Sequence, residues 1–255
     1  MPTPLPPSRG KLWLQRALGF SLIEIAMVLV IMSILLAIVA VPLAAQVEQR
    51  RMEETQKLLE SAKDALYGFA AAKGRLPCPA TAASAGVEAP VGGGVCTAQF
   101  GFLPAVTLGM APVDAGGYAV DAWVDGTSAR RINYAVSNAN TSALTTTDGV
   151  RNATMSTVAA DPHPLPDHLY VCALGLVATP PAANCGAMTT LTSTAPAVIF
   201  SLGKNSNTNS LDETNNQNGD KVFSSGTPNA TFDDLVTWMS LNTLFDRMVR
   251  AGKLP

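Results

Sequence analysis

The chain has 255 residues, which suits one large domain or two small ones, and its formal net charge is −2 at pH 7. This balance provides no basic surface of the kind that nucleic-acid-binding proteins carry. Only 14% of the residues are charged while 47% are hydrophobic, which favours one membrane segment joined to a soluble part.

The N-terminal region contains a basic flank followed by a long apolar run. Residues 1–19 carry three basic side chains and no acid, so this end is expected to stay on the cytoplasmic side of a membrane. The run over 25–47 has no charged residue, and as a helix it would span about 34 Å, enough to cross a bilayer core. A cleavable secretory signal has a shorter apolar core, and Leu43 stands where its cleavage site needs a small residue.

Glu24, at the head of this run, is a carboxylate with no partner in the segment, and ionisable residues in membrane helices usually mark function. It ends the string Gly19-Phe20-Ser21-Leu22-Ile23-Glu24, which resembles the prepilin processing motif of type IV pilins and type II secretion pseudopilins. The resemblance implies that a prepilin peptidase cuts after Gly19 and that the new terminal Phe20 is methylated. It also implies that Glu24 neutralises the Phe20 amine of a neighbouring subunit during assembly, and pairing within its own chain is the alternative.

The apolar run continues into an amphipathic segment, so the sequence predicts one helix over about 22–73. Apolar residues recur at helical spacing from Val47 to Phe69, and charges of both signs fill the other faces. Gly74 stops the helix. Pro42 is expected to kink or loosen it, because proline removes one backbone hydrogen bond.

Beyond the helix the pattern changes to short strands punctuated by Gly, Pro and Asn. The predicted strands are 116–123, 130–138, 168–179 and 196–203. Residues 80–101 are expected to form a loop, whose three consecutive glycines lack the Lys-Ser/Thr of a phosphate-binding loop. The C-terminal segment allows a helix from Thr231, or a short strand followed by a helix from Ser240. Its apolar stripe is predicted to join the core.

Four cysteines form two local pairs in the sequence, Cys78 with Cys96 and Cys172 with Cys185. The short separations suit small disulfide loops, each worth about 3 kcal/mol in the chain-entropy model. Four cysteines allow three connectivities, and free buried thiols are the alternative. Disulfides would place this part of the chain in an oxidising compartment.

Two regions, 121–137 and 200–238, resemble the major-pseudopilin branch of the same family, in which the second region binds calcium. The resemblance implies a calcium site, and calcium takes six to eight oxygen ligands. The candidate ligands are Asn205, Asn207, Asp212, Glu213, Asn215 and Asp220, with Asp233 and Asp234 closing the site from the far side. The loop is longer than is usual in the family, so a solvated polar loop is the alternative.

An enzymatic function is not expected. His163 and His168 lie with Asp161 and Asp167 in a proline-rich segment, which is a weak pattern for a metal site. The sequence contains neither a GxSxG nor an HExxH motif, and no cysteine stands beside a histidine.

The sequence therefore predicts an α+β pilin fold in which a long helix packs on a small antiparallel sheet. Its parts are a removable leader over 1–19, a transmembrane and filament-core helix over 20–47, an amphipathic continuation over 48–74 and a globular head over 75–255. The expected partners are other pilin or pseudopilin subunits, the prepilin peptidase, the inner membrane and its assembly platform, without nucleic acid.

The predicted function is a structural subunit of a type IV pilus or a type II secretion pseudopilus, with the head in the periplasm before assembly. The processed chain is long for a principal subunit, which favours a minor, initiating or tip component. A tip adhesin, or a minor pilin that binds a substrate or DNA, is the alternative. A membrane-tethered periplasmic enzyme is less well supported.

Overall fold

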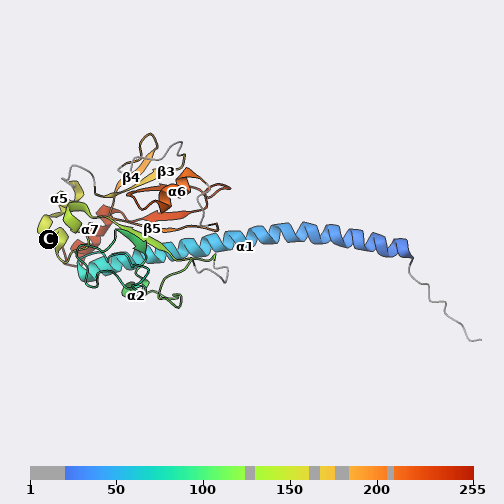
Figure 1. The fold of residues 1–255 in the computed structure, drawn as a ribbon, viewed down its shortest axis with the longest axis horizontal. Helices are drawn as coiled ribbons and strands as arrows, with labels where there is room; N and C mark the ends of the chain where they lie inside the picture. Colours follow the sequence, from blue (N-terminus) through green and yellow to red (C-terminus); the bar gives the residue numbers. More distant parts are fainter. Residues whose placement is uncertain (1–20, 124–129, 161–166, 176–183, 206–209) are drawn as a thin grey trace, which may run out of the picture. The chain divides into compact units, whose positions relative to one another are not determined.

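The computed structural model describes residues 21–123, 130–160, 167–175, 184–205 and 210–255, with the backbone alone for 37–44. The chain divides into two compact units, residues 1–48 and 49–255. Helix α1, Leu22–Lys73, contributes to both and is one continuous helix across Pro42, which confirms the predicted helix (Figure 1). Among the described residues, no helix combines the length and the apolar character needed to cross a bilayer.

The second unit is an α+β structure built around a four-stranded antiparallel sheet. The sheet has the order β1-β2-β5-β7. Its strands are β1 (Phe100–Phe102), β2 (Asn133–Val136), β5 (Ala197–Ser201) and β7 (Leu235–Trp238). Strands β2 and β5 carry Val, Ile, Tyr and Phe, the residue types that suit a buried pleated surface.

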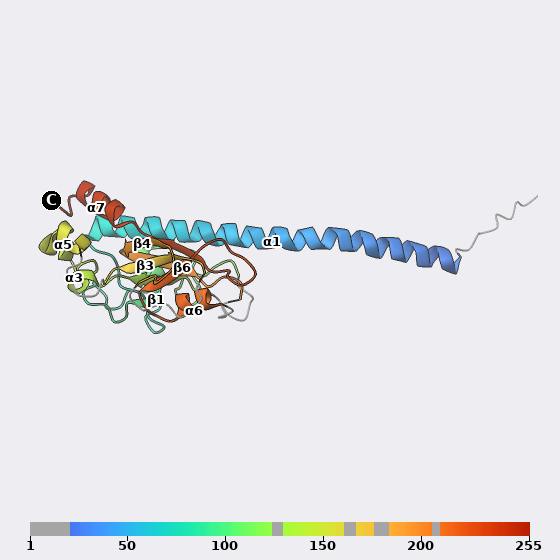
Figure 2. The same ribbon diagram turned by 90° about the horizontal axis from the view of Figure 1, so that it is seen from above.

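A smaller sheet of three strands has the order β4-β3-β6 (Figure 2). It consists of β3 (Leu169–Ala173), β4 (Thr190–Ala195) and β6 (Val222–Ser225). Strand β3 pairs antiparallel with β4 and parallel with β6, so this sheet is mixed. The expectation of an antiparallel sheet therefore holds for the larger sheet and is wrong for the smaller one.

Helices and irregular segments make up the rest of the described part of this unit. The short helices are α2 (Ala105–Leu108), α3 (Ala139–Ser142), α4 (Gly149–Ala153), α5 (Met155–Ala160) and α6 (Leu211–Gln217). Helix α7 (Leu241–Arg250) is preceded by Ser240, whose side chain caps it by accepting from the Thr243 N–H. The second alternative for the C-terminal segment, strand then helix, is therefore confirmed.

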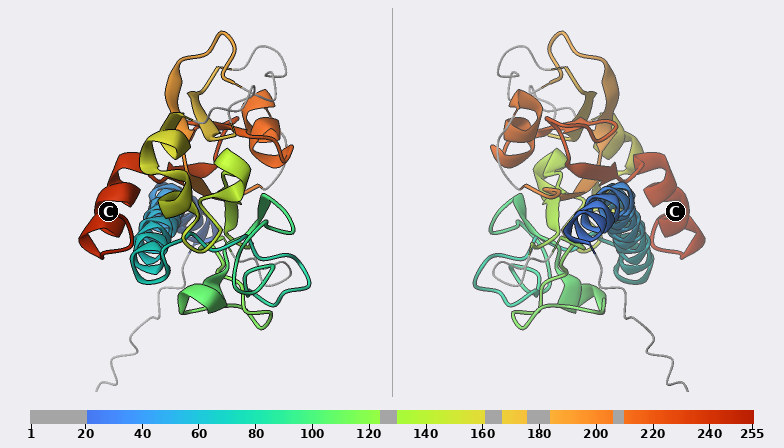
Figure 3. Two further views of the ribbon diagram at one scale, coloured as in Figure 1. Left: turned by 90° about the vertical axis from the view of Figure 1, so that its left-hand side faces the viewer. Right: turned by 90° about the vertical axis from the view of Figure 1, so that its right-hand side faces the viewer.

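Both faces of the four-stranded sheet are buried. On one face Tyr134 and Ile199 pack in a core shared with α1 and α7, which lie side by side (Figure 3). On the other face Ala135 and Phe200 pack against the smaller sheet. Within α1, Leu59, Ala62, Leu66 and Ala70 are all buried, a spacing that places them along one side of the helix.

Three of the expectations for the head are corrected. Residues 116–123 form only an isolated bridge, Val120 with Arg131, because the Asp114 carboxylate accepts from the Gly116 and Tyr118 N–H groups and turns the chain. The loop expected over 80–101 ends in strand β1, and the polar region over 200–220 contains helix α6.

Candidate functional site

The processing motif lies at the start of α1. Gly19 and Phe20 fall outside the described residues, whereas Glu24 lies in the first turn of the helix. The Ser21 backbone N–H donates to Glu24 Oε2 at 3.4 Å. This contact is half of a capping box, in which a Glu three residues after the cap satisfies the cap N–H. Glu24 therefore has a local role in starting the helix, which the sequence analysis missed although Ser-x-x-Glu signals it.

The part of α1 that follows Glu24 presents apolar side chains on all sides. Twelve large side chains between residues 22 and 36 are each more than half exposed. They are Leu22, Ile23, Ile25, Met27, Val28, Leu29, Val30, Ile31, Met32, Ile34, Leu35 and Leu36. A soluble surface helix is apolar along one stripe only, and an all-round apolar helix needs an apolar environment.

Both predicted disulfides are present, Cys78 with Cys96 and Cys172 with Cys185, and no free cysteine remains. A buried ion pair joins the loop of the first disulfide to Arg75, just before it in the chain. Arg75 Nη2 lies 2.7 Å from Glu88 Oε1, and Glu88 also accepts from the backbone N–H groups of Cys78 and Gly92. Disulfide and ion pair together fix this loop against the end of α1.

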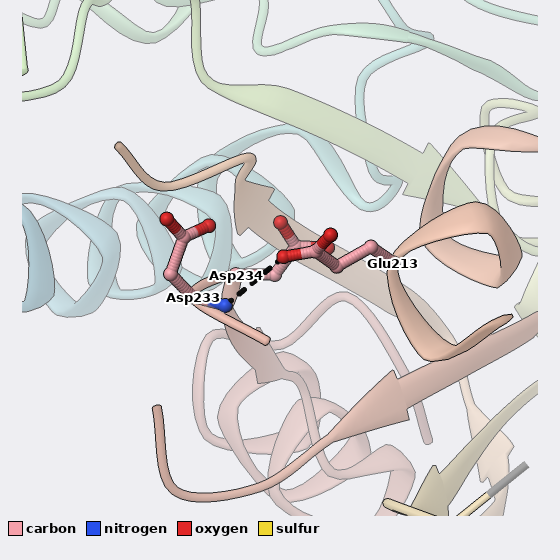
Figure 4. Close-up of side chains that lie close together, drawn as sticks. All are labelled: Glu213, Asp233 and Asp234. Carbon is pink, nitrogen blue, oxygen red and sulfur yellow. Dashed lines mark hydrogen bonds between the residues drawn. The ribbon is translucent and has the colours of Figure 1, made fainter. Parts of the chain in front are cut away.

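Three carboxylates gather where α6 meets the segment before β7. Ligand oxygens of Glu213, Asp233 and Asp234 all lie within 4.8 Å of one another. Figure 4 shows the Asp234 and Glu213 carboxylates close together, and a hydrogen bond of 3.3 Å from the Asp233 N–H to Glu213 Oε1. Glu213 is placed by the cap of α6, because its N–H donates to Ser210 Oγ at 3.2 Å.

Two oxygens of this acidic cluster, defined as Glu213, Asp233 and Asp234, are buried without a hydrogen bond among the described residues. They are Asp233 Oδ1 and Asp234 Oδ1. Asp234 is 1% exposed, and its other oxygen accepts from Asn216 Nδ2 at 2.8 Å. Leaving a buried carboxylate oxygen unpaired is costly, so these atoms need a further partner.

The electrostatics of the cluster indicate the same need. Burial, reinforced by the neighbouring Glu213 and Asp233 charges, raises the pKa of Asp234 to about 7 despite its bond from Asn216. Burial also raises the pKa of Asp233, and the nearby Glu213 charge adds to that rise. A bound cation would reverse both effects, because it favours the ionised carboxylates.

The acidic cluster is a better match for a calcium ion than the full set of loop ligands that the sequence predicted. Its donors are all hard carboxylate oxygens, which calcium prefers. Gly203 allows Asp233 to pack closely against its backbone, since a Cβ there would lie 2.3 Å from the Asp233 carbonyl oxygen and 2.4 Å from Asp233 Oδ1. Of the candidate ligands, Glu213, Asp233 and Asp234 meet here.

The other predicted ligands make different contacts where the structure describes them. Asp212 accepts from the Gly175 N–H, and Asp220 accepts from the Val222 N–H and the Asn218 amide. Asn205 reaches the cluster through its backbone, which donates to Asp233 Oδ2 at 3.3 Å. Asn207 lies outside the described residues, and Asn215 donates to the Val222 carbonyl.

A serine and a histidine also meet in the core. Ser137 Oγ lies 3.2 Å from His168 Nδ1, and both side chains are buried. The serine oxygen also bonds the Asp167 carbonyl and the Ala139 N–H, and His168 Nε2 bonds the Val158 carbonyl at 2.7 Å. These bonds join β2, α5 and β3, and they give the pair a role in packing.

No protein-family model, curated protein or solved structure matches this chain.

Proposed function

We propose that the chain is a pilin-like structural subunit, cleaved after Gly19 by a prepilin peptidase and assembled from the inner membrane into a filament. The filament is a type IV pilus or a type II secretion pseudopilus, in which the subunit serves as a minor, initiating or tip component. The pilin fold proposed for the chain has α1 as its stem and residues 75–255 as its head.

The observation that carries this proposal is the all-round apolar surface of α1 between residues 22 and 36. Such a surface suits the membrane before assembly and the packed centre of a filament afterwards. The two disulfides support a head on the oxidising side of the membrane. The expected partners are therefore other subunits, the peptidase and the assembly platform of the inner membrane.

A substitution at Glu24 separates its proposed role in assembly from its local role in capping α1. The variant Glu24→Gln keeps an acceptor for the Ser21 N–H but removes the charge, so helix α1 should start normally. Assembly should fail, because the amine of a neighbouring Phe20 would lose its counter-ion in an apolar environment. The measurement is the amount of subunit in sheared filaments, with the amount in membranes as reference.

A matched variant, Ser21→Ala, keeps both the backbone N–H that donates to Glu24 and the charge of Glu24. It should assemble nearly as well as the natural chain. Filaments that incorporate Glu24→Gln at the normal level would contradict the charge-pair role, and the proposal for Glu24 would then reduce to capping.

A second function, calcium-dependent stability of the head, is favoured by the unpaired buried oxygens of the acidic cluster. Calcium at about 100 times its dissociation constant stabilises a protein by roughly 2.7 kcal/mol, which raises the melting temperature by about 5 to 10 °C in a chain of this size. The measurement is thermal unfolding of the full chain with calcium and with a chelator.

The variant Asp234→Asn should abolish this calcium effect, since it removes the charge of a cluster carboxylate. Asp220→Asn is the control, because Asp220 lies outside the cluster and bonds its own turn. An equal melting temperature with calcium and chelator, or an equal shift in Asp234→Asn, would exclude the calcium site.

A further inference from the structure

A cavity of about 310 Å³ opens between the larger sheet and the end of α6. Its walls include the rings of Phe100 and Phe102 on β1 and Phe200 on β5, together with Leu202. Three amide residues also line it, Asn133 of β2 and Asn216 and Gln217 of α6. Small-molecule sites are concave and mostly apolar, with a few placed polar groups, and this cavity has that composition at the small end of the usual range.

The rings of the cavity wall are held by other aromatic side chains. Phe223 lies behind two of them, with ring centroids 6.3 Å from Phe100 and 5.3 Å from Phe200. Phe102 makes an edge contact with Tyr118 at 5.2 Å, and the Arg131 guanidinium stacks over its ring at 5.2 Å. The wall is therefore preorganised, and a ligand would not need to order it.

The polar groups of the wall are neutral. Asn133 Nδ2 donates to the Arg131 carbonyl, and its Oδ1 makes no hydrogen bond within the part of the chain that the structure describes. None of the described lining residues carries a formal charge. This composition disfavours phosphates, carboxylates and ammonium groups, which need a charged partner when they leave water.

We propose that this cavity binds one neutral pyranose ring, either a free sugar or the terminal unit of a glycan. The C–H groups on the face of a pyranose carry partial positive charge and pack on the negative face of a phenyl ring. Its hydroxyl groups can donate to Asn133 Oδ1, which a purely apolar ligand would leave unpaired. The site is independent of filament assembly and would give the head a glycan-binding function.

Saturation-transfer NMR on the full chain tests the proposal. The detergent, where one is used, must lack a sugar headgroup. The probes are methyl glucoside, methyl mannoside, methyl galactoside and N-acetylglucosamine, with cyclohexanol and glucose 6-phosphate for comparison. At least one neutral pyranose should receive saturation on its ring protons, and it should bind more tightly than either comparison compound.

Three variants locate the signal. Phe102→Leu keeps an apolar side chain but removes the ring face, and Asn133→Ala removes the free amide oxygen, so each should weaken binding about tenfold. Thr214→Ala is the control, because Thr214 is exposed on the same helix as Gln217 but does not line the cavity. Thermal unfolding reports whether each variant is folded. If Phe102→Leu does not fold, the binding measured for Asn133→Ala decides the test.

The proposal is overturned if the folded natural chain transfers saturation to no neutral pyranose. It is also overturned if binding survives unchanged in folded Phe102→Leu and folded Asn133→Ala, or if cyclohexanol binds as tightly as the sugars. The last result would assign the cavity to apolar ligands.

Discussion

Glu88 and Asp234 are both buried carboxylates, and their surroundings act on them in opposite directions. Burial alone would raise the pKa of Glu88, but the Arg75 hydrogen bonds and charge, with two backbone N–H groups, hold it below the usual value. Asp234 has one amide donor and two acidic neighbours, so its pKa rises to about 7. Of these two buried acids, Glu88 thus has a basic neighbour, whereas the charged groups that act on Asp234 are both acidic.

The raised pKa of Asp234 predicts how stability depends on pH when calcium is removed. Between its ordinary value of 3.8 and about 7 the folded chain binds more protons than the unfolded chain, so stability falls as pH rises through this window. A displacement of this size is worth on the order of 4 kcal/mol. Asp234→Asn should therefore be more stable than the natural chain at pH 8 in chelator, and the difference should shrink towards pH 5.

The measurement is the difference in melting temperature between the two chains at each pH. Carboxylates with a lowered pKa, such as Glu88 and Asp114, have the opposite pH dependence but cancel in this difference. A difference that does not change with pH would show that Asp234 is ionised in the folded chain at all these values.

At the scale of elements, α1 has two surfaces of different chemistry along its length. Its first part exposes apolar side chains on all sides, whereas its later part buries a single stripe in the head. The stripe reaches α7, where the Ser240 N–H donates to Tyr67 Oη at 2.9 Å and the Arg247 guanidinium lies over the Tyr67 ring. The head is therefore fixed to its own stem by packing and by hydrogen bonds.

Leu66→Ala tests how much this stripe contributes. Leu66 is fully buried, so its truncation should destabilise the head by about 2 to 5 kcal/mol through lost burial and a cavity. Ser61→Ala is the control, because Ser61 is exposed on the same helix and Ala favours a helix. Chemical denaturation of the full chain measures both, and equal midpoints would mean that the stripe does not hold the head.

The sequence predicted elements whose signals are local and strong. The helical spacing of apolar residues in α1 continues over many turns and ends clearly at Gly74. Strands β2 and β5 are rich in β-branched and aromatic residues. Strand β4 is rich in Thr and β6 has four residues, so neither has a distinct pattern, and both owe their conformation to pairing with β3. Helix α6 was missed in a polar region, although Ser210 and Glu213 form the same Ser-x-x-Glu start as Ser21 and Glu24.

The ligands of the candidate site could be predicted only in part, because their relative positions depend on structure that the local sequence pattern does not reveal. Carboxylates and amides were abundant in one region, but the sequence could not tell which of them face each other. Formation of α6 turns Glu213 towards the segment before β7, and it leaves Asp212 on another side, where it accepts from Gly175. The conformation of a seven-residue helix thus selects the ligands.

For the whole molecule, the proposed processing step predicts a change of mass. Gly19→Leu should block cleavage, because the peptidase motif requires a small residue before the cut, and the precursor should accumulate with its leader attached. Mass spectrometry of the purified chain separates the two forms. Replacing Gly10, which lies in the leader outside the motif, is the matched control. A processed Gly19→Leu chain would contradict the peptidase assignment.

The contact between Tyr67 and Ser240 joins residues that are 173 positions apart in the sequence. Strand β7 likewise completes the edge of the larger sheet beside β5, and α7 closes the core against α1. A chain released before these last elements are made would leave both the sheet edge and the helix stripe uncovered. A chain truncated before β7 would therefore expose apolar surface and an unpaired strand edge, which make it prone to aggregation and recognisable to chaperones and proteases.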